Sequence, residues 1–152
     1  MKEKTVKGIF SLALAGFSAY FGELLVPLCI LLVAMVLDYI SGLGKAWVTR
    51  TLSSRQGLVG ILKKVWYLLV VCVGMVVDWV INMVLTGMGV TAWSSCFVGL
   101  LVIVWLIINE LLSIIENTAQ IGVPIPSFLR SLVKRLKVAT ETKGEEAFED
   151  GD

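Results

Sequence analysis

Acidic side chains interrupt the most apolar stretches of this sequence. Asp38 stands near the end of one apolar run, Asp78 in the middle of a second, and Glu110 in a third. Carboxylates in such surroundings suit three kinds of chemistry: hydrogen bonds that hold helices together, the lining of a water-filled hole, or a proton or ion path. We therefore ask which elements position these groups and what they face.

The polar residues of the apolar runs recur at helical spacing. Residues four apart share one face of a helix, so the sequence predicts three polar or small-residue stripes. Their members are Asp38, Ser41 and Lys45; Gly74, Asp78, Asn82 and Thr86; and Asn109, Ser113, Glu116 and Gln120, with Glu110 beside the last stripe. Charged groups within a span usually face a bundle interior or water. For Asp38 and Glu116, an extended side chain that reaches the inner membrane interface is the alternative.

The composition is that of an integral membrane protein. Of 152 residues, 57% are hydrophobic and only 16% are charged, whereas soluble domains have about a quarter charged residues. The chain has no His, no nucleophile–base pair and no Gly-rich phosphate loop, and its three cysteines show no metal-binding spacing. We therefore expect no catalysis, no metal and no cofactor, and we expect no nucleic-acid binding because the basic residues flank apolar segments.

Four apolar stretches are candidates for membrane-spanning helices. They cover residues 6–22, 24–41, 65–90 and 96–115. A spanning helix needs about 17–25 residues, so the last three qualify readily, while the first either spans or lies in the interface. The predicted fold is all-α, with about four transmembrane helices.

The basic residues predict the orientation of these spans. They gather near the N-terminus, in residues 42–64, and after residue 129. By the positive-inside rule all three regions are cytoplasmic. Four spans with both termini in the cytoplasm satisfy this, and the last two spans then form a hairpin with a short outer turn, "GMGVTAWSS". Three spans with the N-terminus outside would place Lys2, Lys4 and Lys7 on the wrong side.

The segments outside the spans have their own patterns. Residues 42–64 form an interfacial loop, with helix-start residues at Ser53 and Ser54. Gly122, Pro124 and Pro126 stop the last span, and an amphipathic helix is predicted over 127–137. Its basic side chains suit the anionic inner leaflet of a bilayer. These membrane-surface residues are Arg130, Lys134, Arg135 and Lys137. Residues 138–152 form an acidic tail that we expect to be disordered and cytoplasmic.

Three motifs together resemble the toxin-secretion/phage-lysis holin family of bacteriophages. They are "LDYISGLGKAW" (37–47), "LSSRQGLVGILKK" (52–64) and "NELLSIIENTAQIGVPIPSFLRSL" (109–132), in this order and with an apolar hairpin between the second and third. The resemblance covers roughly residues 30 to 137. It implies a phage or prophage protein of the bacterial cytoplasmic membrane that assembles into holes at a set time. Such holes release an endolysin or, in some relatives, a large toxin.

This resemblance gives the polar stripes a role. We interpret them as pore or assembly residues, hidden against other helices before assembly and facing water in the homo-oligomer. They are Asp38, Lys45, Asp78, Asn82, Asn109, Glu110, Ser113 and Glu116. A chain of this length without an internal repeat needs several copies to form a pore. A non-lytic export channel is the alternative, and a small ion or proton transporter using Asp78 and Glu110 is a more distant one.

Overall fold

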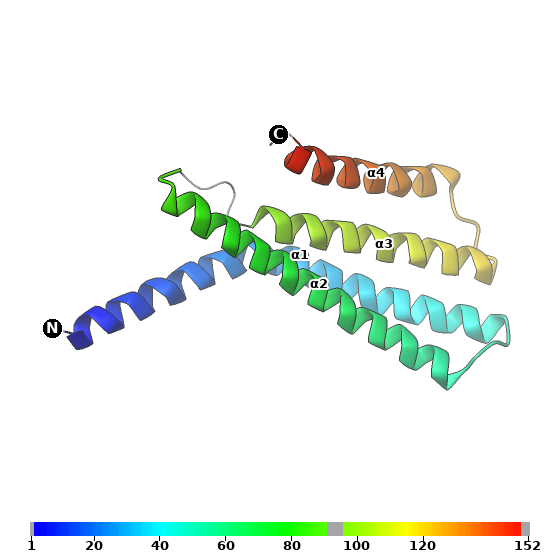
Figure 1. The fold of residues 1–152 in the computed structure, drawn as a ribbon. Coiled ribbons are helices and arrows are strands. Elements are labelled where there is room, and N and C mark those ends of the chain that lie inside the picture. Colours follow the sequence, from blue (N-terminus) through cyan, green and yellow to red (C-terminus); the bar gives the residue numbers. More distant parts are fainter. Residues whose placement is uncertain (1, 91–95, 150–152) are drawn as a thin grey trace.

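The chain folds into four α-helices. The computed structural model describes residues 2–90 and 96–149, and no strand occurs in them, which confirms the predicted all-α class (Figure 1). The helices are α1 (Lys2–Val48), α2 (Ser54–Gly87), α3 (Phe97–Ile121) and α4 (Ser127–Glu149).

Helix α3 lies at the centre of the helix bundle of one chain. It packs against all three other helices, whereas α1 and α2 contact each other much less. Helices α1 and α3 run in the same direction, and α2 and α4 return in the opposite one (Figure 1). The main core lies between α1, α2 and α3. Its buried members are Leu24, Leu31, Met35, Val71, Cys96, Ile103 and Leu106.

Three helices are long and apolar enough to cross a membrane: Gly22–Val48 of α1, all of α2 and all of α3. Their outer surfaces remain apolar, with many exposed Val, Leu and Ile side chains. Examples are Leu25, Val33 and Leu37 on α1 and Val73, Val76 and Trp79 on α2. So large an exposed apolar surface needs lipid or another protein to cover it. This is a multi-pass membrane protein.

The predicted first span differs from the structure. Residues 6–22 and 24–41 form one continuous helix, α1, of 47 residues, or about 70 Å at 1.5 Å per residue. Gly22 and Glu23 supply no turn, and Pro27 lies inside the helix, as membrane helices commonly allow. The structure therefore has three candidate spans in its described residues, and the hairpin that placed the N-terminus in the cytoplasm does not form. The N-terminal half of α1 points away from the other helices (Figure 1).

The predicted loop over 42–64 is much shorter in the structure. Helix α1 continues to Val48 and α2 begins at Ser54, so only residues 49–53 connect them. Ser53 has an extended backbone and is the N-cap residue, which confirms the predicted helix start. Helix α3 ends as predicted, because Gly122 adopts a left-handed conformation, with φ of 98°, directly after Ile121. Residues 91–95 of the expected outer turn lie outside the described residues.

The C-terminal helix is longer than predicted. It begins at Ser127 as expected, but it continues through Glu149, so most of the tail that we expected to be disordered is helical. Two causes explain the difference. Residues 138–149 include four Glu and two Ala, which favour helices, and α4 packs against α3. Residues 150–152 lie outside the described part of the chain.

Candidate functional site: a charged cluster between three spans

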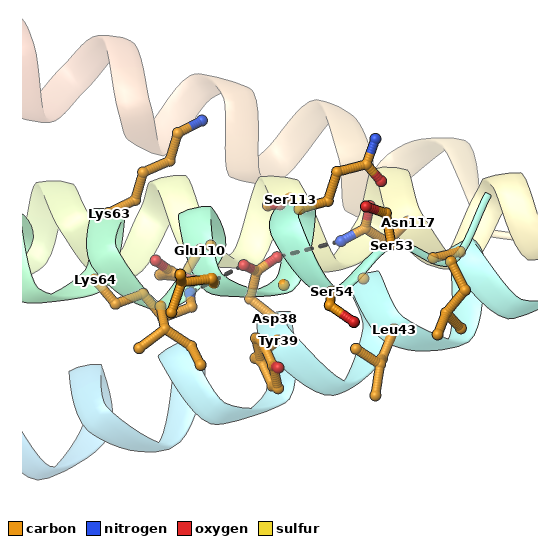
Figure 2. A pocket seen from close by; sticks show the side chains of 18 of the residues that line it. Asp38, Tyr39, Leu43, Ser53, Ser54, Lys63, Lys64, Glu110, Ser113 and Asn117 are labelled. Carbon is orange, nitrogen blue, oxygen red and sulfur yellow. Dashed lines mark hydrogen bonds and ion pairs between the residues drawn. The ribbon is translucent and has the colours of Figure 1, made fainter.

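An ion cluster joins the three candidate spans. The Lys64 ammonium of α2 donates a hydrogen bond to Asp38 Oδ2 of α1 at 2.9 Å and another to Glu110 Oε2 of α3 at 2.6 Å (Figure 2). We call Asp38, Lys64 and Glu110 the charged cluster. Helix α2 runs antiparallel to α1 and α3, so the beginning of α2 lies beside the later halves of both. One cation thus serves two carboxylates.

Amide and hydroxyl groups complete the surroundings of Asp38. Asn117 Nδ2 donates to Asp38 Oδ1 and to Ser41 Oγ, each at 3.2 Å, and Ser41 Oγ donates to the Asp38 backbone oxygen at 2.9 Å. Both carboxylate oxygens of Asp38 are therefore engaged. Asn117 belongs to α3, so these bonds also link α1 to α3.

The charged cluster is withdrawn from solvent. The side chain of Glu110 is only 3% exposed, and those of Lys64 and Asp38 are 16% and 18% exposed. Counting charges, two carboxylates and one ammonium leave a net charge of −1. Removing one partner of a buried ion pair costs about 3–5 kcal/mol, because the remaining charge stays buried without compensation. Each member therefore fixes the packing of three helices.

Sequence reasoning missed this function of Lys64. The charge pattern of the sequence groups Lys64 only with the basic residues that mark the cytoplasmic side. A signal was present, because Lys64 directly precedes the long apolar run that starts at Val65, where a cation has little water.

A cavity of about 610 Å³ opens beside the charged cluster, where α1 and α2 separate. All three sequence motifs supply its walls (Figure 2). Its polar lining residues are Asp38, Tyr39, Ser53, Ser54, Gln56, Lys63, Lys64, Tyr67, Asn109, Glu110, Ser113 and Asn117. The predicted site residues Asn109 and Ser113 thus lie together with Asp38 and Glu110.

Asp78 has a separate place and a structural task. Its carboxylate, 3% exposed, accepts hydrogen bonds from the backbone N–H groups of Val98 at 2.8 Å and Gly99 at 2.7 Å. These N–H groups belong to the first turn of α3, where the helix itself supplies no acceptor. Asp78 of α2 therefore caps α3. Asn82 Nδ2 donates to the Asp78 backbone oxygen at 2.8 Å.

The remaining predicted site residues lie away from both places. Glu116 is exposed on α3, and Lys45 is half-buried in the last turn of α1. On α4, Arg130, Lys134 and Arg135 are exposed. The Lys137 ammonium instead lies 5.9 Å from the centre of the Trp105 ring on α3. The described residues include no group of three or more His, Cys, Asp or Glu that could hold a metal ion.

Comparison with known proteins identifies the family. The model of the bacteriophage holin family matches residues 15–138, which include the charged cluster, the cavity and the capping Asp78. The chain belongs to the bacteriophage holin family. This is a family of membrane-pore proteins, not of enzymes. The match also confirms the resemblance inferred from the three motifs.

Individual relatives of this holin-family protein cover most of its length. A protein described as a probable holin in Bacillus phage phi105 is 32% identical over 116 residues, which are 76% of this chain and 78% of that one. An uncharacterised protein of Halalkalibacterium halodurans is 35% identical over 135 residues, covering 89% and 96% of the two chains. One of Clostridium perfringens is 38% identical over 120 residues, covering 79% and 82%. No solved structure matches.

Proposed function

We propose that this protein is a holin that oligomerises in the bacterial cytoplasmic membrane and opens holes through which an endolysin leaves at a set time. The observation that carries the proposal is the charged cluster, which lies inside one protomer and ties three apolar helices together. A holin must first accumulate without damage and then assemble, and a bundle that pairs its buried charges internally and exposes apolar surfaces on α1 and α2 suits the first requirement.

The energetics of burial support this sequence of events. A charge at the centre of a lipid-facing helix costs about 2.5–3.5 kcal/mol on the insertion scale. Asp38, Lys64 and Glu110 avoid that cost because they face one another between helices. Three spans enclose no passage for a folded enzyme, so a hole needs several copies. The exposed apolar surfaces of α1 and α2 are available for contacts between copies and with lipid.

The basic residues orient the protomer in this proposal. Lys45, Arg50, Arg55 and Lys63 gather around the α1–α2 connection, which is therefore cytoplasmic. Because α3 runs parallel to α1, its C-terminal end lies on the same side, and α4 begins there (Figure 1). The continuous α1 then starts on the opposite side of the membrane, so Lys2, Lys4 and Lys7 depart from the positive-inside pattern that the other basic residues follow.

The alternatives differ in what passes the membrane. A non-lytic export channel would use the same bundle and differ only in its cargo and in cell survival. The transporter alternative loses support, because Asp78 caps α3 and Glu110 is paired with Lys64. The two acids that a shared ion path would need are thus separately engaged.

Inducible expression in a bacterium, with and without a cytoplasmic endolysin, tests the proposal. We expect an abrupt, timed loss of viability with dye entry, and a fall in turbidity only when the endolysin is present. Slow growth without dye entry or endolysin release would refute it. Dye entry with release of a large protein but without loss of viability would favour the export channel.

A further inference from the structure

Helix α4 lies along most of α3. Near the start of α4, Val133 is 5% exposed and packs in one cluster with Ile108 and Ile115 of α3. Further along, Trp105 Nε1 of α3 donates a hydrogen bond to Glu141 Oε1 at 2.9 Å. The two helices are antiparallel (Figure 1), so α4 returns from the cytoplasmic end of α3 towards its outer end.

Gly144 lets the C-terminal part of α4 lie close to the N-terminal part of α3. A Cβ atom added at Gly144 would lie 3.1 Å from Leu101 Cδ2, and Leu101 is only five residues into α3. Small residues let two helices approach closely within a membrane. Helix α4 therefore lies at the depth of the membrane-spanning part of α3.

The other face of α4 is strongly charged. Away from the contact with Trp105, six charged side chains of α4 are exposed: Arg130, Lys134, Arg135, Lys143, Glu145 and Glu146. Each of these charges would be costly in lipid near the bilayer centre. If α3 spans the membrane, the docked α4 must therefore have water on its outer face.

We propose that α4, docked on α3, is the water-facing lining of the assembled hole. This inference rests on the proposed function and adds which surface faces the lumen. In the ring, the α3–α4 side of each protomer faces inward, and the apolar faces of α1 and α2 contact lipid and neighbouring copies. Before assembly, α4 leaves α3 and lies on the inner leaflet, where Phe128, Leu132 and Leu136 enter the lipid beside its basic residues.

The alternative lining, made of the carboxylate stripes on α1 and α3, is disfavoured by the same structure. Asp38 and Glu110 would reach a lumen only after the bonds to Lys64 break and the three helices separate. Apart from Lys137 and Glu141, which contact Trp105, the charged side chains of α4 named above are exposed without any change in the bundle. A lining by α4 thus leaves the charged cluster intact.

A disulfide trap measures when α4 docks. The variant carries Leu101→Cys and Gly144→Cys in a chain whose Cys29, Cys72 and Cys96 are replaced by Ala. Membranes are sampled before and after the onset of dye entry and treated with an oxidant. The matched control pairs Leu101→Cys with Glu146→Cys, which lies on the exposed face of α4. We expect a several-fold rise in cross-linking for the first pair at dye entry, and little cross-linking of the control at either time.

Two outcomes would overturn the inference. One is cross-linking that falls or disappears when dye entry begins, and the other is equal cross-linking of the two pairs throughout. Failure of the proposed function has a different signature, because the chain with its native residues at 101 and 144 would then show no dye entry at all.

A second measurement covers the case in which the double-cysteine chain does not assemble. Glu145→Cys, in vesicles with open holes, is labelled with a bulky polyethylene-glycol maleimide, and Thr49→Cys in the exposed α1–α2 connection is the matched control. We expect the label at position 145 to reduce dye efflux several-fold and the label at 49 to leave it unchanged. Unchanged efflux for the labelled Glu145→Cys chain would refute a lining by α4.

Discussion

The most direct test of the charged cluster is Lys64→Met. Methionine keeps much of the length of the side chain but removes the ammonium that pairs with both Asp38 and Glu110. The net charge of the cluster changes from −1 to −2, and both hydrogen bonds to the carboxylates are lost. We expect the protomer to lose stability because two acids then face each other with little access to water.

The structure sets the size of the effect. Loss of one partner from a buried ion pair costs about 3–5 kcal/mol, whereas an exposed pair is worth at most about 1 kcal/mol. Glu110 is 3% exposed, so the buried value applies to its pair with Lys64. Asp38 is 18% exposed and has Asn117 as a second donor, so removing Lys64 destabilises the Asp38 carboxylate less than that of Glu110. We therefore expect a loss of about 3 kcal/mol in the free energy of unfolding.

Unfolding in detergent micelles, followed by circular dichroism, measures this loss, and lysis timing in expressing cells reports its consequence. Lys63→Met is the matched control, because the neighbouring lysine is exposed, and it should change stability by less than about 0.5 kcal/mol. Adding Glu110→Gln to Lys64→Met removes the more buried carboxylate and should restore part of the stability. The reasoning fails if Lys64→Met unfolds like the unaltered chain and lyses cells on schedule.

Three further predictions concern the helix contacts and ends. Asp78→Asn leaves one fewer acceptor for the first turn of α3, so we expect a loss of about 1–3 kcal/mol in micelles and altered lysis timing; normal timing at normal protein levels would remove Asp78 from the mechanism. Gly74→Ala places a Cβ 3.2 Å from the Gly99 Cα and should lower the unfolding temperature, whereas Gly60→Ala, with open space around it, should keep or raise it. Gly122→Ala forces a side chain into a left-handed conformation and should cost about 1–2 kcal/mol by the same unfolding assay; an unchanged midpoint would contradict this.

The fold was predictable wherever a local signal decided it. Apolar runs identified the three spans, Ser53 marked the start of α2, and Gly122 marked the end of α3. The continuity of α1 was not predictable from the distribution of charges. The positive-inside rule favoured four spans, and four spans need a turn near residues 22–24, which the helix does not make. The helical tail was missed because its contact with Trp105 is tertiary, and because the Glu residues that favour a helix there are equally typical of a disordered acidic tail.

The site shows the same division. Helical spacing correctly singled out the acids, and the family motifs marked the right segments. Spacing on one helix cannot show which residue of another helix lies opposite, so the partner of Asp38 and Glu110 stayed hidden until α2 was placed. Asp78 illustrates the limit most clearly. Its position in the middle of an apolar run led us to interpret it as a pore or assembly residue, yet that position equally suits a carboxylate that caps another helix.

Two of the polar contacts between α3 and other helices lie on different sides of α3, and this gives the protomer two faces. Glu110 accepts a hydrogen bond from Lys64 of α2. Trp105, five residues before Glu110 on α3, donates one to Glu141 of α4. Five residues at about 100° each place the two side chains about 140° apart around the axis. One side of α3 therefore faces the Lys64 ammonium, while the other holds the charged helix α4, which faces water in the proposal above. The hole that we propose needs a wall with this division, and in that proposal α3 separates the two environments.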